Sequence, residues 1–468
     1  MKKTKIITSL GPSSYNEKTF TEMVKNGANV ARINFSHVTP EEKKLDLDAI
    51  HAARKNTGCP IAILYDTKGP EFRNGVFEGD EVVLEEGKTI RIVKDEVIGN
   101  KERFSVNHPS AISSLKVGTE VFLLNGLMKL VVTSVEDDGV TCKIVNGGVL
   151  GNKKSMSVPG IQLNIPFISE ADREDIIYAC EHEGDYLALS FVGSREDVLE
   201  ARKILKDHNR EDMKIIAKIE SLTGINNLDS ILEVSDGVMV ARGDLGAEVP
   251  MSMLPVYQKE IIKCARKHGK IAVVATEMLE SMMKNSRPTR AEVSDVSAAV
   301  YDGADAVMLS GETTMGDHPV EVVKYMAEIC ETAEQFYDYD KKFEHDKISG
   351  VSELVAQGVV ECAKAEDVKV IVAHSISGNT ARRISNLKPT CPILATCDNE
   401  ELARGLCLNY GVYSSIVKYT DDMDEIVAAS KKAACEKFDL KEKDEVIITA
   451  GLNNKEKPVT NFMKIEEI

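Results

Sequence analysis

Residues that handle phosphate and metal ions end two apolar segments in the middle of the chain. Lys218 and Glu220 close the segment KIIAKIE, and Asp244 follows the segment VMVA. In an extended strand Lys218 and Glu220 lie on one face, because side chains alternate. We expect Asp244 in a tight loop between Gly243 and Gly246, where backbone amides can face an anion while the carboxylate faces a cation. One cation and two carboxylates predict a divalent-metal site beside an anionic substrate.

A regular strand–helix alternation surrounds these residues and must position them. Short apolar segments predict eight strands, at residues 5–8, 30–34, 61–65, 186–190, 215–220, 237–241, 271–276 and 306–310. Amphipathic stretches predict helices at residues 17–25, 41–55, 170–183, 195–207, 255–267 and 292–301. Alternation implies parallel strands, and eight such units close a TIM (β/α) barrel with its functional residues at the strands' carboxyl ends. The predicted fold class is α/β.

The alternation is interrupted once, after the third strand. Residues 71–166 contain short strands separated by Gly and Asn-Gly turns, which predicts a small all-β domain at the functional rim, where it can act as a lid. We expect the barrel at residues 1–70 and 167–340, an inserted β-barrel lid at 71–166, and a C-terminal α/β domain at 341–468. That last domain should follow a charged linker at 340–350, with strands at 368–373, 393–397 and 446–449 and helices at 352–365, 380–386, 400–406 and 423–438.

Bulk properties exclude several kinds of partner. The 468 residues carry 58 basic and 75 acidic side chains, a net charge of −17, which disfavours nucleic acid and anionic membranes. The sequence has no apolar run long enough to span a bilayer, and its basic N-terminal stretch lacks the apolar core of a signal peptide. The ten cysteines form no C-x-x-C pair, which favours reduced thiols and a cytoplasmic location.

Polar residues at other strand ends fit the same site. Arg32 and Asn34 share one face of the second strand, Asp66 follows the third, and Thr276 ends the seventh. A single polar residue at a strand end is most often solvated. Several strands that all end in residues suited to an anion and a metal ion indicate one shared pocket.

Longer motifs around these residues resemble the pyruvate kinase family. They are VARINFSH, DTKGPEFR, AKIES, VMVARGDLGAEVP, ATEMLESM and PTRAEVSDVSAAVYDGADAVMLSGET, in the family's order and with the all-β insertion in the family's place. The resemblance covers nearly the whole chain. It implies transfer of a phosphoryl group from phosphoenolpyruvate to ADP, which gives pyruvate and ATP in the last step of glycolysis, and a homotetramer.

The resemblance implies a role for each residue of the central cluster. Glu220 and Asp244 would hold Mg²⁺ (or Mn²⁺), while Lys218 and Arg32 would stabilise the charge of the phosphoryl group in flight. The alternative for Lys218 is a structural salt bridge to one of these acids, and for Asp244 a helix N-cap.

Two further residues would handle the rest of the substrate. The backbone amides of Gly243, Asp244 and Thr276 would bind the substrate carboxylate. Thr276 would also orient a water or relay that protonates the enolate, because its hydroxyl is too weak an acid to act alone. The alternative for Thr276 is a β-branched residue that only packs.

A monovalent-cation site is also implied. Asn34, Ser36, Asp66 and Thr67 resemble the family's K⁺ ligands, and Glu71 is the acidic residue that accompanies K⁺ dependence, where a lysine replaces the ion in other members. K⁺ would offset the carboxylate beside an anionic substrate. The alternative for Glu71 is a solvated side chain.

Nucleotide contacts are implied at the rim. Asn34, His37, Arg73 and Lys154 match nucleotide-binding positions, although flexible surface residues of these types are often only solvated. The inserted domain departs from the family pattern at Leu124-Asn125-Gly126 and in KSMSVPG, where Ser155 replaces a glycine. Gly193 and Glu277 stand where an arginine and a glutamine are usual. These departures predict altered lid closure or nucleotide preference, which ordinary ADP selectivity would contradict.

The loop HSISGNTAR in the last domain resembles the family's effector-phosphate loop. Ser375, Ser377, Gly378, Asn379 and Thr380 offer hydroxyls, an amide and helix N-terminal N–H groups to an anion, but no lysine or arginine stands among these five residues. Ordinary helix capping is the alternative. Activation by a sugar phosphate is predicted, and flat saturation curves with and without effectors would contradict it.

Two other functions remain open at this point. A metal-dependent pyruvate aldolase or lyase on a similar barrel also uses an acidic pair, but it lacks the inserted domain, the K⁺ motif and the C-terminal domain. The second alternative is a regulatory protein that binds phosphorylated ligands without turnover. A coupled lactate dehydrogenase assay with phosphoenolpyruvate and ADP separates all three.

Overall fold

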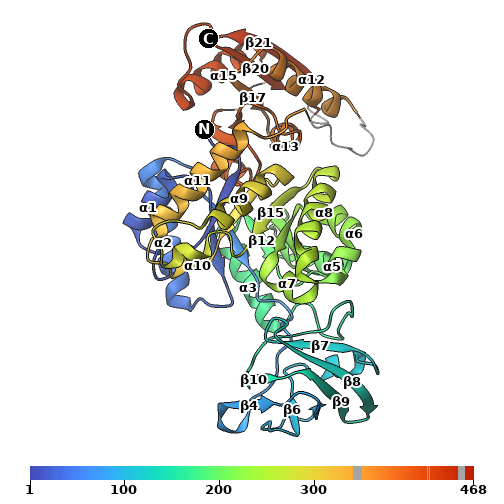
Figure 1. Ribbon diagram of the computed structural model, residues 1–468. Coiled ribbons are helices and arrows are strands. Elements are labelled where there is room, and N and C mark those ends of the chain that lie inside the picture. Colours follow the sequence, from blue (N-terminus) through green and yellow to red (C-terminus); the bar gives the residue numbers. More distant parts are fainter. Residues whose placement is uncertain (341–349, 419, 421, 452–458) are drawn as a thin grey trace.

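The computed structural model describes residues 1–340, 350–418, 420, 422–451 and 459–468. Three parts follow one another along the long axis of the molecule, with the barrel in the middle, the inserted strands at one end and the C-terminal α/β part at the other (Figure 1). The expected linker at residues 340–350 lies almost wholly outside the described residues.

The middle part is a closed barrel of eight parallel strands, which confirms the predicted fold class. The strands are β1 (Lys5–Ser9), β2 (Val30–Asn34), β3 (Ala62–Asp66), β12 (Tyr186–Leu189), β13 (Lys214–Ile219), β14 (Gly237–Ala241), β15 (Ile271–Ala275) and β16 (Ala306–Leu309). They pair in the order β1-β16-β15-β14-β13-β12-β3-β2, and β2 closes on β1. Every expected barrel strand exists, with ends shifted by at most one residue.

Amphipathic helices cover the barrel and share one core with its outward-facing side chains. They are α1 (Glu17–Lys25), α2 (Pro40–Thr57), α3 (Glu170–Glu181), α4 (Arg195–Asp207), α5 (Leu222–Asn226), α6 (Leu228–Val234), α7 (Arg242–Glu248), α8 (Leu254–Lys267), α9 (Arg290–Asp302), α10 (Gly311–Thr314) and α11 (Pro319–Gln335). Capping boxes begin α2, α3, α4 and α9, which is why the sequence located these starts well. Helices α5, α6, α7, α10 and α11 were not anticipated.

The segment after β14 is a helix and not the tight loop expected from its two glycines. Helix α7 begins at Arg242, directly after the strand, and Asp244 lies in its first turn. Neither Gly243 nor Gly246 has a positive φ. The expected glycine turn is therefore wrong, and the exposed amides near Asp244 belong to the first turn of α7.

The inserted strands form an all-β unit with its own core. A six-stranded sheet has the order β11-β7-β8-β9-β5-β6, and β10 pairs with β4 in a two-stranded sheet, so the described strands do not close into one barrel. The strands are β4 (Glu81–Leu84), β5 (Thr89–Val93), β6 (Arg103–Ser105), β7 (Glu120–Leu123), β8 (Met128–Glu136), β9 (Gly139–Asn146), β10 (Gly148–Gly151) and β11 (Met156–Ser157). The unit leaves the barrel after β3 and returns before α3, at the carboxyl ends of the strands.

The C-terminal part is a five-stranded sheet with helices on both faces. Its strands are β17 (Val370–His374), β18 (Ile393–Cys397), β19 (Val412–Ile416), β20 (Glu445–Ala450) and β21 (Phe462–Glu467), and its helices are α12 (Val351–Ala365), α13 (Asn379–Asn386), α14 (Glu400–Arg404) and α15 (Met423–Lys437). The sequence missed β19 and β21. Both carry polar or charged residues at the edges of the sheet, so neither shows a continuous apolar run. No helix among the described residues is long and apolar enough to cross a membrane.

Candidate active site

A cavity of about 180 Å³ opens at the carboxyl ends of the barrel strands, beside the inserted domain. Residues from β2, β3, β12, β13, β14 and β15 meet there, because each strand ends at this rim. Among the residues expected from the sequence, it is lined by Arg32, Asn34, Ser36, His37, Thr67, Glu71, Arg73, Lys218, Glu220, Asp244 and Thr276. Asp66, Gly243 and Lys154 are not among its lining residues.

A buried charge network forms the floor of this cavity. Lys218 Nζ lies 3.1 Å from Glu220 Oε1 and 3.2 Å from Asp66 Oδ1, and it donates to Ser190 Oγ at 2.6 Å. Burial alone would lower the pKa of Lys218, but Asp66 and Glu220 outweigh burial and raise the pKa to about 12. The ammonium group therefore stays charged at the base of the pocket.

Glu220 has the features of a metal ligand. Its side chain is buried; Oε2 accepts a hydrogen bond from the Phe191 N–H at 2.6 Å, while Oε1 faces Lys218 Nζ at 3.1 Å in an ion pair. Burial raises the pKa of this carboxyl to about 7, and the nearby Asp244 adds to the shift. Two carboxylates, Glu220 and Asp244, line the same cavity, and oxygen ligands of this kind fit a hard divalent cation such as Mg²⁺.

Asp66 holds the two cations of the site in place. Arg32 Nε donates to its Oδ2 at 2.7 Å, and Arg32 also donates to Ser9 Oγ at 2.8 Å. Although burial favours the neutral acid, Lys218 and Arg32 together hold the pKa of Asp66 below its ordinary value. Its side chain is fully buried, so it positions Arg32 and Lys218 from behind the cavity wall.

Thr276 lies just beyond β15 in a left-handed backbone conformation, with φ of 71°. The Gly243 N–H donates to its Oγ1 at 2.9 Å, so the hydroxyl hydrogen is directed elsewhere. The strand expected at residues 271–276 ends one residue earlier in the structure, at Ala275. A β-branched residue with positive φ is strained and needs support from its surroundings.

That support comes from Arg242 and Asp295, which sequence reasoning did not single out. Buried Arg242 donates to the carbonyl oxygen of Thr276 at 2.6 Å and to both carboxylate oxygens of Asp295 on α9, at 2.7 and 2.8 Å. Both residues stood inside quoted motifs, but only the fold brings α7 and α9 together. Ser190, which contacts Lys218, was missed in the same way.

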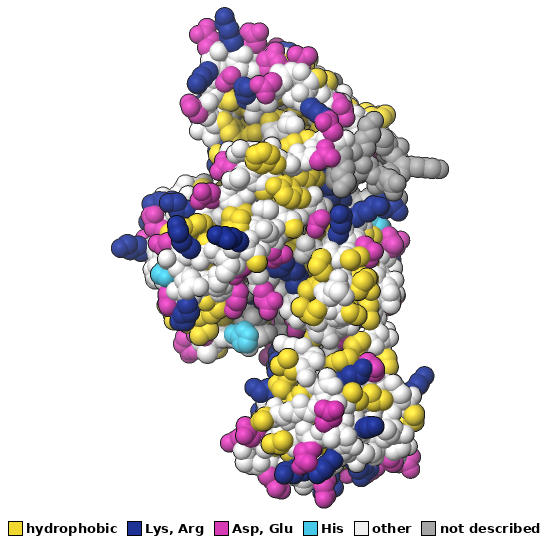
Figure 2. Space-filling view, in the orientation of Figure 1, with side chains coloured by type: hydrophobic (Ala, Val, Ile, Leu, Met, Phe, Trp, Pro, Cys, Tyr) yellow, Lys and Arg dark blue, Asp and Glu magenta, His cyan; other side chains and the backbone are white. Residues whose placement is uncertain are grey.

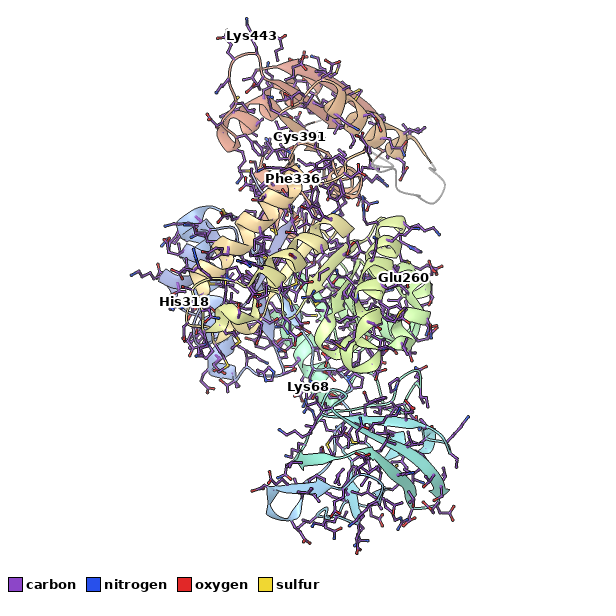
Figure 3. All side chains as sticks on the ribbon, in the orientation of Figure 1. Lys68, Glu260, His318, Phe336, Cys391 and Lys443 are labelled. Carbon is purple, nitrogen blue, oxygen red and sulfur yellow. The ribbon has the colours of Figure 1, made fainter. Side chains whose placement is uncertain are left out.

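The outer rim differs from expectation at two positions. Arg73 donates to both oxygens of Glu71, at 2.7 and 2.9 Å, so Glu71 is not simply solvated. Burial opposes this ionised pair, but Arg73 holds the pKa of Glu71 below its ordinary value. This part of the rim, marked by Lys68, lies where the barrel meets the inserted domain (Figure 3).

The second position is Lys154. Its side chain lies over Gly151 in the inserted domain and does not reach the cavity.

A crevice of about 190 Å³ adjoins the cavity between the inserted domain and the barrel, and Asp244, Glu71 and Arg73 line both spaces. Two residues that depart from the family pattern contact each other there, because Ser155 Oγ donates to Asn125 Oδ1 at 2.8 Å. Gly193 lines the same crevice. Ser155, Asn125 and Gly193 thus lie together on this crevice, whereas Glu277 is outside it, directly after Thr276.

The candidate effector loop borders a small cavity of about 40 Å³ in the C-terminal part. Ser375, Ser377, Asn379, Thr380 and Arg383 line it. Arg383 adds a basic group to the cavity, although it also donates to Glu353 on α12. Helix α13 has no side-chain cap on its first turn, but Ser375 Oγ accepts a hydrogen bond from the N–H of its N-cap residue Gly378 at 3.1 Å, so a loop hydroxyl does contribute local hydrogen bonding.

A closed parallel barrel with a buried lysine, an arginine and two carboxylates at its carboxyl end is the architecture of a metal-dependent TIM-barrel enzyme that acts on an anionic substrate. Family models for the pyruvate kinase barrel domain and the pyruvate kinase alpha/beta domain match residues 1–323 and 353–466. The chain therefore belongs to the pyruvate kinase family, as the motifs implied.

Individual relatives agree over the full length. A pyruvate kinase from Geobacillus stearothermophilus is 42% identical over all of this chain and 80% of the relative. One from Clostridium perfringens is 38% identical over 100% of both chains. The crystal structure of a pyruvate kinase from Cryptosporidium parvum superposes with a TM-score of 0.95 at 36% identity, covering 100% of this chain and 96% of the other. The chain is thus a phosphotransferase that transfers the phosphoryl group of phosphoenolpyruvate to ADP, the glycolytic reaction of its family.

Proposed function

We propose that phosphoryl transfer takes place in the cavity at the carboxyl end of the barrel, with Lys218 at its centre. The observation that carries this proposal is the approach of Lys218 Nζ to Glu220 and Asp66 within 3.2 Å at the bottom of an open pocket. Phosphoryl transfer leaves the protein little covalent work, so positioned charge supplies most of the rate.

Each charged group has a task that follows from its surroundings. Glu220 and Asp244 would hold a divalent cation, Mg²⁺ or Mn²⁺, which neutralises phosphate charge when bound. Lys218 is charged and fixed by Ser190, so it meets the phosphoryl oxygens without reorganising. Arg32, oriented by Asp66 and Ser9, offers further donors to the same group.

Thr276 would serve the second half of the reaction. The enolate left after transfer must gain a proton at carbon. Since Oγ1 already accepts the Gly243 N–H, the hydroxyl donates its own hydrogen toward another acceptor, which orients a water for that proton transfer. The same bond occupies the Gly243 amide, so substrate must displace it if this amide is to bind the carboxylate. Arg242 acts through Thr276 as a positioning residue.

The remaining assignments are part of the same proposal. Asn34, Ser36, Asp66 and Thr67 would bind K⁺ close to Glu71, and His37 and Arg73 would contact the nucleotide. Lys154 could join them only if the inserted domain moves. A sugar phosphate would bind at the Ser375–Thr380 loop beside Arg383. The ten cysteines form no disulfide, which supports a cytoplasmic location.

The test is a coupled lactate dehydrogenase assay with phosphoenolpyruvate and ADP, titrated with Mg²⁺. Lys218→Met should lower kcat about 10²–10³-fold, the loss typical of one preorganised charge-stabilising donor. Glu220→Gln should raise the Mg²⁺ concentration needed for half-activation at least about tenfold, because one carboxylate ligand is lost.

The matched controls are Lys55→Met and Glu233→Gln, since both residues are exposed and lie outside the pocket. They should leave kcat and the Mg²⁺ requirement unchanged. Wild-type activity in Lys218→Met, or an unchanged Mg²⁺ titration in Glu220→Gln, would overturn the assignment of these residues but not the membership of the family.

A further inference from the structure

A second group of metal-ligating side chains lies on the outside of the barrel, where the reaction does not use it. It consists of Asp229 in the first turn of α6, Cys264 in the last turn of α8 and His268, the residue that caps α8. Helices α6 and α8 pack side by side on one flank of the barrel (Figure 1). Figure 3 marks this flank by Glu260, which belongs to the same helix α8.

The distances from Asp229 to the other two ligand atoms are those of a tetrahedral metal site. Asp229 Oδ1 lies 3.5 Å from Cys264 Sγ and 3.5 Å from His268 Nε2, and one ligand atom from each residue lies within 4.8 Å of the others. Zinc bonds to nitrogen, sulfur and oxygen at about 2.0–2.3 Å, so two ligand atoms at a tetrahedral zinc are separated by about 3.3–3.6 Å. Both distances to Asp229 therefore agree with the edges of a zinc tetrahedron.

The histidine is already in the tautomer that a metal ion needs. His268 Nδ1 lies 3.0 Å from the carbonyl oxygen of Cys264, and a carbonyl can only accept, so Nδ1 carries the hydrogen. Nε2 faces Asp229 Oδ1 at 3.5 Å, and its lone pair binds a metal ion when this nitrogen carries no proton. Backbone contacts of this kind fix the ring orientation of metal-ligating histidines.

The mixture of ligands selects the ion. Thiolate, imidazole and carboxylate together suit Zn²⁺, whereas Mg²⁺ takes oxygen ligands and avoids sulfur. Glu220 and Asp244 offer only oxygen ligands, so the active site and this trio should prefer different ions. Asp229 is largely exposed, with 77% of its side chain accessible, which leaves the fourth position open to water.

We propose that Asp229, Cys264 and His268 bind one Zn²⁺ ion that joins α6 to α8. Binding converts the Cys264 thiol to a thiolate and releases its proton to solvent, so the affinity rises with pH. In the sequence, α6 precedes and α8 follows β14 and α7, the elements that carry Asp244 into the active site. The ion would therefore fix the two helices that flank these elements along the chain. The expected effect is on the stability of this flank, and the proposal does not depend on the assignment of the catalytic residues.

The test uses Zn²⁺ and Co²⁺ as probes on the full chain after treatment with a chelator. Competition with a chromogenic zinc chelator should give one tight site per chain. Co²⁺ in that site should show a thiolate-to-cobalt charge-transfer band, which oxygen ligands in the active site do not give. Zn²⁺ should also raise the melting temperature by a few degrees.

Three variants make the result specific. Cys264→Ser and His268→Gln should each weaken Zn²⁺ binding at least about tenfold, and Cys264→Ser should abolish the charge-transfer band. Cys435→Ser, at the exposed cysteine of α15, is the matched control and should change neither. If Cys264→Ser does not fold, His268→Gln carries the test. Equal Zn²⁺ affinity in wild type and variants, or no thiolate band, would overturn the proposal and leave the trio as a hydrogen-bonded contact between helices.

Discussion

At the scale of single residues, the pocket is organised by pairing of opposite charges. Lys218 and Arg32 both pair with Asp66, and Lys218 also pairs with Glu220, so each cation has a partner before substrate arrives. Glu71 adds a carboxylate at the rim, and Arg73 pairs with it. If Arg73 binds the nucleotide, Glu71 loses its ion-pair partner and is left as an unpaired carboxylate beside an anionic substrate. This is the physical reason to expect a monovalent cation here.

We therefore predict K⁺ activation that depends on Glu71. Replacing K⁺ by tetramethylammonium at constant ionic strength should lower kcat/KM at least about tenfold. A unit charge within about 10 Å is worth about 1.7 kcal/mol at an effective dielectric constant of about 20. Glu71→Lys should lose most of this dependence, because its ammonium takes the place of the ion, whereas Lys88→Glu, in the exposed turn between β4 and β5 and outside the pocket, should keep it. Undiminished activity of the wild type without K⁺ would contradict the prediction.

At the scale of elements, helix α2 carries an unusual buried group. Asp46 is fully buried, and neither carboxylate oxygen has a hydrogen-bond partner among the described residues. Burial, and secondarily Glu42, raise its pKa from 3.8 to about 7, and the hydroxyl groups of Tyr65 and Tyr178 lie close enough to sense its charge. The folded protein therefore holds a proton that the unfolded chain releases.

This raised pKa predicts a pH-dependent cost to stability. The contribution of Asp46 is fully favourable below its unfolded pKa of 3.8 and is lost as the pH rises through about 7. Asp46→Asn should accordingly be more stable relative to the wild type at pH 8, by about 1–3 kcal/mol, because only the aspartate must then retain a proton or bury a charge. The gain should shrink at pH 5.5. Urea unfolding at both pH values measures the difference in the free energy of unfolding between the variant and the wild type. An equal difference at pH 5.5 and pH 8 would exclude titration of Asp46 as its source. Asp48→Asn, on the same helix, is the control.

At the scale of the whole molecule, one face of the barrel exposes apolar side chains that a monomer would leave in water. Met251, Met253 and Val256 precede or begin α8, and Val293 and Tyr301 lie on α9, all at least 36% exposed. Figure 2 shows hydrophobic side chains gathered over the barrel at the level of α7 and α8. Patches of this kind mark protein interfaces, and homotetramers are general in the family.

We predict a homotetramer in solution that uses this face. Val256→Glu should dissociate it, because a charge would be buried without a partner. Val135→Glu, at an exposed position of the inserted domain, should not. Sedimentation velocity distinguishes the species, and a monomeric wild type or a tetrameric Val256→Glu variant would refute the assignment of this interface.

The sequence by itself determined the order of the barrel strands and predicted which residues meet at their carboxyl ends. Alternating apolar and amphipathic segments located all eight barrel strands, because periodicity and capping are local properties of the chain. The residues at the strand ends could also be assigned to one pocket, because parallel strands in a barrel all end at a common rim.

Only the tertiary structure decided how these residues are supported and which others join them. Arg242 and Asp295 are 53 residues apart, and no local pattern pairs them. The helix at Arg242 replaced the expected glycine loop, since packing and backbone hydrogen bonds outweigh the turn preference of two glycines. Asp229 meets Cys264 and His268 only because α6 packs against α8. Contacts between distant segments depend on packing, and packing is the property that periodicity does not encode.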